Sequence, residues 1–294
     1  MGDGGLAESF DETAQMATHR AMTLTCLGTS DAFGSAGRHC AGYLVETGAG
    51  QFLVDAGPSV LSALKSVGRS TEPIDGVLLS HLHGDHFGGV PFLLLEYTYE
   101  RPRTRPLVVV GPPGTEERVF ELYRALYADA GREPLRFPVE FVELSDHDAH
   151  EIGDLRVESF AVPHVRTGLA LGLRLSAASR VLVYSGDTSW TATLLEESRG
   201  ADLFLCECST FATQVPGHVR YSEIEENRRR LECRQLLLTH LGREMRERSG
   251  EIAEALANDG MRLEVGASPL PNEQLRPTRS ARGARSHRSA PGVR

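Results

Sequence analysis

The chain has 294 residues, of which 40% are hydrophobic and 24% charged, with a formal net charge of −9. This composition is close to that of globular proteins, and no segment recurs at the fixed period that a solenoid or propeller needs. No apolar run approaches the ~20 residues that cross a bilayer, so we expect no membrane-spanning segment. The five cysteines are scattered and the first residues are acidic rather than basic, which favours a cytoplasmic protein without a disulfide framework.

The charge is unevenly distributed along the chain, which indicates three segments. Residues 274–294 contain six arginines and no acidic residue, so these six positive charges leave −15 for the remainder. This stretch is rich in Ser, Pro, Gly and Arg, a composition that does not offset the entropy cost of ordering. We expect a flexible leader over residues 1–20, one folded domain over 21–266 and a disordered, Arg-rich tail over 267–294.

Hydrophobic periodicity predicts strands and helices in alternation. Strands are expected at 22–27, 42–46, 51–55, 76–80, 107–110, 139–144, 155–162, 169–175, 180–185, 201–207, 234–239 and 261–265. Helices are expected at 59–67, 115–130, 222–231 and 249–257, with Thr115 as the cap of the second. An early hairpin followed by strand–helix alternation predicts a mixed α/β domain with helices on the outer faces of its sheets.

The segment 80–89 concentrates potential metal ligands directly after a predicted strand. Three imidazoles and one carboxylate occupy six positions: His81, His83, Asp85 and His86. Such side chains are common ligands of divalent transition metals, and residues two apart on an extended backbone point the same way. Because one ion cannot easily use four ligands from so short a loop, we expect two neighbouring ions, each bound by a pair.

Three further candidate ligands each follow a predicted strand, namely His164, Asp187 and His240. The carboxyl ends of several strands converge on one edge of a sheet, where α/β folds place their sites. Together with the first group they give five histidines and two aspartates, enough for two ions with one bridging carboxylate. These ligands suit Zn²⁺, the ion we expect, and also Mn²⁺ or Fe²⁺.

The pattern His-x-His-x-Asp-His at 81–86 is similar to the signature of the metallo-β-lactamase superfamily, and the likeness spans about residues 22–266. It implies a metallo-β-lactamase-type αβ/βα four-layer sandwich with a dinuclear site at one edge. The implied ligands are His81, His83 and His164 for the first ion, Asp85, His86 and His240 for the second, and Asp187 as the bridge. Asp55 stands where the superfamily has a supporting aspartate, which implies that it orients a ligand.

An aspartate at position 187, where common β-lactamases have a cysteine, makes the chain more similar to the ribonuclease Z group. Segment 201–208 resembles that group's strand ending in His-Glu-Ala-Thr, with Cys206 in the place of the histidine and Glu207 retained. His218 resembles the group's second histidine element. The resemblance implies that Glu207 orients His218, that His218 protonates the leaving oxygen of a phosphodiester, and that Asp85 belongs to the catalytic set.

The substrate is constrained by the spacing between His164 and Asp187. Ribonuclease Z enzymes that process transfer RNA carry a long arm there, whereas 23 positions separate these residues here and two predicted strands occupy them. The acidic body also repels long polyanions. The sequence therefore favours a dinuclear-metal hydrolase of small, cyclic or nucleotide phosphodiesters and disfavours long RNA and membranes as partners.

Other functions stay open at this point: a tRNA 3′-processing endoribonuclease, a lactone or carboxylic ester hydrolase, and a non-enzymatic metal- or nucleotide-binding module. A pair of divalent ions can polarise a phosphoryl or a carbonyl oxygen. A phosphodiesterase should depend on His218, whereas a lactonase need not. The sequence is compatible with a homodimer but does not fix the oligomeric state.

Overall fold

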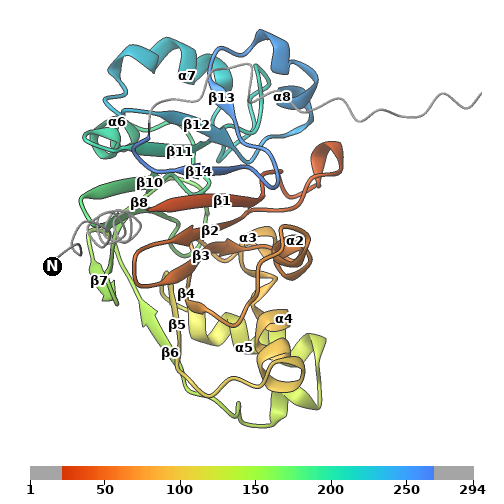
Figure 1. Cartoon of the computed structure of the whole chain (residues 1–294). Helices are drawn as coiled ribbons and strands as arrows, with labels where there is room; N and C mark the ends of the chain where they lie inside the picture. Colours follow the sequence, from red (N-terminus) through yellow and green to blue (C-terminus); the bar gives the residue numbers. More distant parts are fainter. Residues whose placement is uncertain (1–21, 268–294) are drawn as a thin grey trace, which may run out of the picture.

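The computed structural model describes residues 22–267 (Figure 1). The leader expected over 1–20 and, apart from residue 267, the tail expected over 267–294 lie outside the described residues. Within the described range, no helix is both long and apolar enough to span a bilayer.

The strands form two seven-stranded sheets. The first has the order β14-β1-β2-β3-β4-β5-β6 and comprises β1 (Thr23–Gly28), β2 (Gly42–Glu46), β3 (Gln51–Ala56), β4 (Ile74–Leu78), β5 (Leu107–Gly111), β6 (Val139–Glu143) and β14 (Arg262–Glu264). The second has the order β13-β12-β11-β10-β9-β8-β7 and comprises β7 (Ala149–Ile152), β8 (Leu155–Ala161), β9 (Leu171–Ala177), β10 (Arg180–Tyr184), β11 (Leu203–Glu207), β12 (Leu236–Thr239) and β13 (Ala255–Leu256).

Each sheet is antiparallel on one side and parallel on the other. Strands β14 to β3 pair antiparallel, as the predicted hairpin requires, and β3 to β6 pair parallel. The second sheet repeats this plan, with β7 to β10 antiparallel and β10 to β13 parallel. Because parallel strands end at the same edge of a sheet, the loops that follow them are gathered together.

Short helices cover the outer faces of the sheets (Figure 1). They are α2 (Val60–Ser66), α3 (Gly84–Phe87), α4 (Val90–Leu95), α5 (Thr115–Leu126), α6 (Ala192–Ser198), α7 (Tyr221–Asn227) and α8 (Arg243–Glu247). Single turns add η1 (Ser35–Gly37), η2 (Glu96–Glu100), η3 (Ala130–Arg132), η4 (Arg228–Arg230) and η5 (Ser249–Glu251).

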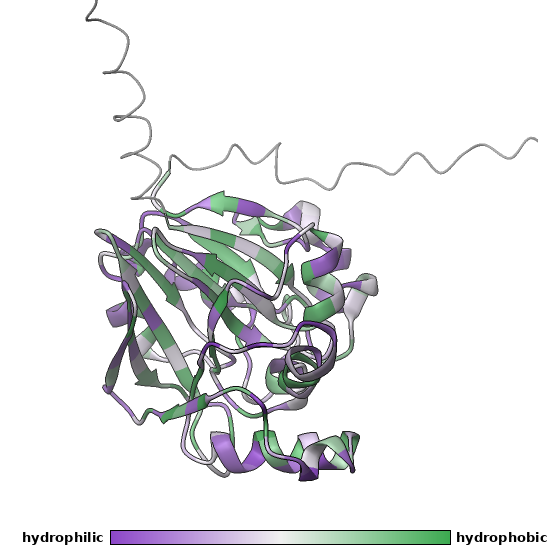
Figure 2. Cartoon of the chain, turned by 60° about the horizontal axis from the view of Figure 1, so that its bottom comes forward, coloured by the Kyte–Doolittle hydropathy of each residue, from purple (hydrophilic) through white to green (hydrophobic). Residues whose placement is uncertain are grey.

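Three apolar clusters separate four layers. One lies between the sheets and joins residues such as Tyr43 of the first sheet to Leu205 of the second. Another packs α2, α4 and α5 on the first sheet, and the third packs α6, α7 and α8 on the second. Figure 2 shows the strands largely in green, for hydrophobic residues, whereas the helices mix green and purple. This confirms the predicted four-layer sandwich, because amphipathic helices bury one face against each sheet.

One predicted helix is absent, and another is present but differs in its cap residue and its end. Gly114, whose φ of 91° favours glycine, occupies the cap position of α5, and Thr115 is the first helical residue; the helix ends at Leu126 rather than at 130. The predicted helix at 249–257 is the single turn η5 followed by β13, which pairs in parallel with β12. Pairing at the sheet edge satisfies the backbone N–H and C=O groups of this segment. Its hydrophobic periodicity is weak, which is why the helix prediction fails here. Strand β7 and helices α3, α4, α6 and α8 were not predicted.

Candidate metal centre

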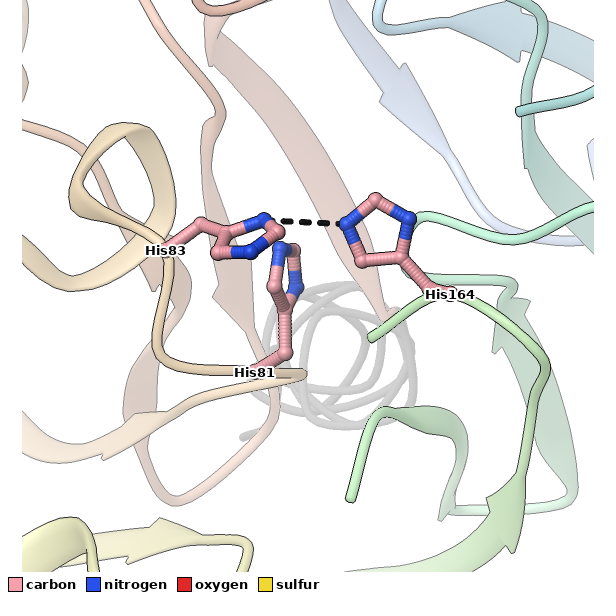
Figure 3. A group of neighbouring side chains, drawn as sticks. All are labelled: His81, His83 and His164. Atoms are coloured by element: carbon pink, nitrogen blue, oxygen red, sulfur yellow. Dashed lines mark hydrogen bonds between the residues drawn. The ribbon is translucent and has the colours of Figure 1, made fainter. Parts of the chain in front are cut away.

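Three histidines from two separate loops form the first group of candidate ligands (Figure 3). His81 and His83 lie between β4 and α3, and His164 lies between β8 and β9. Their potential ligand atoms lie within 4.8 Å of one another. Nε2 of His164 is 3.0 Å from Nδ1 of His83, and two ring nitrogens come this close only if a proton or a cation is shared between them. The three rings therefore converge on one point.

A second group lies beside the first and consists of Asp85, His86, Asp187 and His240. Oδ2 of Asp187 is 3.2 Å from Nε2 of His86 and 3.2 Å from Nε2 of His240. The same oxygen lies 3.8 Å from Nε2 of His164, in the first group. The fold thus brings all seven predicted ligands together, and the place of Asp187 between the groups fits a bridging carboxylate.

The donor atoms fit divalent transition metals. Four buried atoms of these side chains have no hydrogen-bond partner among residues 22–267: His81 Nε2, His86 Nε2, Asp187 Oδ1 and His240 Nδ1. Buried polar atoms are nearly always paired, so the unpaired atoms of His81, His86 and Asp187 indicate that ions are their partners. His240 presents its other ring nitrogen, Nε2, to Asp187. Imidazole nitrogens and carboxylate oxygens are the donors that zinc, manganese and iron accept.

The charges of the site suit a cation. Burial, followed by repulsion from His86, holds the pKa of His81 well below its usual range, which leaves a neutral ring. Burial opposes ionisation of Asp187, but His240 and His86 outweigh it and hold the pKa of Asp187 well below its usual range. Burial also opposes protonation of His86, yet Asp187 and Asp55 raise the pKa of His86 well above its usual range. A metal bound by His86 must displace a proton, so metal binding weakens as pH falls.

Asp55, at the end of β3, lies behind His86 and holds its ring. Its Oδ2 accepts hydrogen bonds from Nδ1 of His86 at 2.7 Å and from the Tyr184 hydroxyl at 2.8 Å. The backbone N–H and the hydroxyl of Ser80 donate to the two carboxylate oxygens, each at 2.8 Å. A carboxylate in this position fixes the tautomer and orientation of a ligand histidine. Tyr184 and Ser80 were not predicted from the sequence. A tyrosine in a strand and a serine after one do not by themselves indicate a hydrogen bond to a distant carboxylate.

Glu207 and His218 form a hydrogen-bonded pair next to both groups. Nδ1 of His218 donates to Oε1 of Glu207 at 2.9 Å. The buried carboxylate also accepts from the Thr188 N–H at 2.8 Å and from the Ser209 hydroxyl at 3.0 Å. Burial would lower the pKa of His218, but Glu207 outweighs it and raises the pKa of His218 to about 9. The ring is therefore protonated at neutral pH, and it stacks on His240 with centroids 5.5 Å apart.

The loop that carries His218 also holds His164. The carbonyl of Gly217 lies 2.8 Å from Nδ1 of His164, so that nitrogen donates and Nε2 stays available to a metal. Gly217 has φ of 84°, and a Cβ there would lie 3.0 Å from Nδ1 of His164. Only glycine fits this close approach without strain. The loop therefore couples the predicted proton donor to a predicted ligand.

Comparison with known proteins agrees with this geometry. Residues 22–257 match the family model described as the anti-Pycsar protein Apyc1. The ribonuclease Z of Lachnoclostridium phytofermentans is 26% identical over 271 residues, which cover 74% of this chain and 87% of that protein. The ribonuclease Z of Mycobacterium sp. (strain KMS) is 30% identical over 61% of this chain and 66%, just under two thirds, of that protein.

A solved structure confirms the fold class. The metallo-β-lactamase fold protein YhfI from Bacillus subtilis superposes with a TM-score of 0.68 at 24% identity, covering 83% of this chain and 99% of that chain. The superfamily and the likeness to ribonuclease Z were both predicted from the sequence, whereas the anti-Pycsar family was not. The chain belongs to the anti-Pycsar protein Apyc1 family and is a metal-dependent hydrolase of metallo-β-lactamase fold related to ribonuclease Z.

Proposed function

We propose that this chain is a phosphodiesterase that uses two divalent ions to hydrolyse small, cyclic or nucleotide phosphodiesters. The observation that carries this proposal is the Glu207–His218 pair beside the two ligand groups. A diester with a poor leaving group needs an acid at its departing oxygen, and a protonated imidazole held by a buried carboxylate is such an acid.

In this proposal the side chains divide the work as follows. The first ion would be held by His81, His83 and His164 and the second by Asp85, His86 and His240, which belong to the two candidate ligand groups. Asp187 would contribute to both. Two such ions, when bound, supply a nucleophile at neutral pH and neutralise charge on the phosphoryl oxygens. Asp55 keeps the ring of His86 oriented. Nε2 of His218 gives its proton to the leaving oxygen as the bond to phosphorus breaks, and Glu207 holds the imidazole in place.

The size of the substrate is inferred from the stretch between His164 and Asp187. It contains β9, β10 and short connections, which leaves no length for a substrate-gripping arm. The chain carries −9 overall, and a surface that is acidic on balance binds long RNA weakly. Both observations support a small diester rather than precursor tRNA.

A turnover panel on metal-loaded, full-length protein tests the proposal. The panel contains bis-p-nitrophenyl phosphate, cyclic nucleotides, a lactone and a precursor tRNA. We expect turnover of the small and cyclic diesters that exceeds tRNA cleavage by orders of magnitude. Lactone turnover without diester cleavage would contradict the proposal.

The relatives named ribonuclease Z make tRNA 3′ processing the second candidate. The basic stretch 274–294 could supply RNA affinity, so the tRNA assay is run with full-length and truncated protein at two salt concentrations. RNA binding through this stretch would weaken steeply as salt rises. Site-specific removal of a tRNA 3′ trailer by either form, at rates matching diester turnover, would establish the second candidate instead.

A further inference from the structure

The loop that joins β11 to α7, residues 208–220, carries His218 but buries little of its own surface. Residues 212–216 are all exposed. Ordering a loop costs conformational entropy, and exposed residues recover little of that cost through burial. A catalytic side chain must nevertheless be held close to one productive position. The proton donor therefore depends on specific contacts that fix this loop.

Backbone hydrogen bonds close the base of the loop. The N–H of Ser209 donates to the carbonyl of Val219 at 3.1 Å, and the N–H of Tyr221 donates to the carbonyl of Thr210 at 2.8 Å. These two bonds join the residues that flank the loop, on either side of His218. The segment that follows the base on its first strand, residues 211–213, must be held by contacts from elsewhere.

Glu244 of α8 supplies these contacts. Its Oε2 accepts hydrogen bonds from three successive backbone N–H groups, those of Phe211 at 3.0 Å, Ala212 at 3.3 Å and Thr213 at 3.2 Å. Successive N–H groups form a concave site for an anion, and hydrogen bonds to a carboxylate are stronger than those to a neutral acceptor. Desolvation opposes ionisation of Glu244, but the three N–H groups outweigh it and lower the pKa of the carboxyl. Glu244 is therefore charged at neutral pH.

A second contact from α8 reaches the same segment. The guanidinium carbon of Arg248, one turn after Glu244, lies 3.6 Å from the ring centroid of Phe211, in a cation–π contact. Ala212 and Thr213 are exposed, so water can satisfy their N–H groups if the carboxylate is removed. The effect of Glu244 is therefore to select one position of the segment rather than to satisfy buried donors.

Helix α8 is itself fixed to the core and to the second ligand group. It begins three residues after His240. Met245 is buried in the apolar cluster under the second sheet. Arg246 donates to the carbonyl of Ala257 at 3.1 Å and to the hydroxyl of Thr29 at 2.7 Å. The loop is thus held against an element whose position is set together with that of a candidate ligand.

We infer that Glu244 is a positioning residue for His218, because it fixes the loop that brings the proton donor to the leaving oxygen. This inference rests on the proposed function and adds to it a residue outside the two ligand groups. The carbonyl of Gly217, in the same loop, accepts a hydrogen bond from Nδ1 of His164. Loosening the loop should therefore also weaken metal binding at the first group.

The first test measures turnover by the metal-loaded, full-length protein. We expect Glu244→Ala to lose about tenfold on a 3′,5′-cyclic nucleotide, whose leaving oxygen needs a proton, and less on bis-p-nitrophenyl phosphate. Glu244→Gln keeps a neutral oxygen acceptor and should lose about threefold, so it carries the comparison if the alanine variant does not fold. Glu247→Ala is the matched control, since Glu247 is exposed on the same helix and pairs with Arg243 at 2.7 Å.

A double-mutant cycle shows whether Glu244 acts through His218. At saturating Zn²⁺, the double variant of His218→Ala and Glu244→Ala should be no slower on the cyclic nucleotide than His218→Ala alone. A loosened loop that has already lost its proton donor has no proton transfer left to impair. Losses that add in full would overturn the inference and leave Glu244 with a purely structural role.

Hydrogen exchange and metal affinity separate failure of this inference from failure of the proposed function. The amides of Gly217 and His218 make no hydrogen bond to Glu244, so their exchange reports on the loop as a whole. In Glu244→Ala they should exchange about tenfold faster than in Glu247→Ala, and Zn²⁺ should bind more weakly in competition with a chelator.

If these changes appear but the unmodified protein hydrolyses no diester, Glu244 still holds the loop and the proposed function fails. If diesters are hydrolysed and Glu244→Ala matches the unmodified protein in exchange and in turnover, the positioning role is overturned and the proposed function stands.

Discussion

The two sheets contribute to the site in different ways. The first sheet supplies four candidate ligands from one short segment, His81 to His86, directly after β4. The second supplies its residues one at a time, at or after the ends of different strands: His164 after β8, Asp187 after β10, Glu207 at the end of β11 and His240 after β12. A contiguous motif needs only local geometry, whereas dispersed residues meet only if the whole sheet pairs in the right register.

The largest effect is expected where the two contributions meet, at Asp187. Its carboxylate lies between the groups, 3.2 Å from His86 and 3.2 Å from His240. Asp187→Ala should bind fewer than two ions and lose diester turnover by about a thousandfold or more, since it removes a ligand and leaves buried cations less neutralised. Metal analysis per chain together with turnover measures this. Asp154→Ala, in an exposed turn, is the control, and a variant that keeps two ions and full activity would rule out the bridge.

His218→Ala tests a residue supplied by the second sheet alone. We expect it to fold and keep its metals but to lose turnover by about a hundredfold, the usual scale for a general acid. Esters with poor leaving groups should lose more than p-nitrophenyl esters, which scarcely need protonation. His150→Ala, on β7, serves as the control. Equal losses on both kinds of ester would show that His218 is only structural.

The charge of Glu207 should set the pH range of activity. Because the pKa of His218 is raised to about 9, the acid form is present below that pH, and turnover of poor leaving groups should fall as pH rises through it. Glu207→Gln removes the negative charge, so the pKa of His218 should fall toward the ~6.5 of a free histidine. At pH 8 the rate should then drop by roughly tenfold or more. A pH profile with an unmoved alkaline limb would contradict this role.

The smallest effect is expected for Tyr184→Phe. Tyr184 lies on a strand of the second sheet and contacts Asp55, the carboxylate of the first sheet that orients His86. The variant removes the hydroxyl that donates to Asp55 at 2.8 Å and keeps the ring. Metal affinity should fall about tenfold, which is typical when a residue that orients a metal ligand is lost. The free energy of unfolding should fall by about 1 kcal/mol. Competition with a chelator and chemical denaturation measure the two effects. Leu173→Val, in the same core cluster, controls for a change of packing alone.

The contrast between the contiguous ligand segment of the first sheet and the dispersed residues of the second explains how much of the site could be predicted from the sequence. Spacing within 81–86 and the position of His164, Asp187 and His240 after apolar runs were enough to nominate all seven ligands. The four-layer arrangement followed from the resemblance and from strand–helix alternation. Tyr184 and Ser80 could not be predicted, because their role depends on a carboxylate brought to them from another strand.

Short elements were also beyond sequence reasoning. Helix α3 has four residues and lies within the ligand segment, where ligand chemistry rather than helical periodicity determines the residue types. Strand β13 has two residues and exists because β12 offers it an edge. Neither is long enough for a hydrophobic period to appear.

The central claim is that two ions act together in one site, and a single titration tests it directly. Metal-free protein is loaded with Zn²⁺ in steps, and bound metal per chain is measured alongside the rate of bis-p-nitrophenyl phosphate hydrolysis. We predict that the rate stays low until the second ion binds and saturates at two ions per chain, because the Asp187 carboxylate lies between the two ligand groups. Full activity at one ion per chain, with no change on further loading, would contradict the dinuclear account.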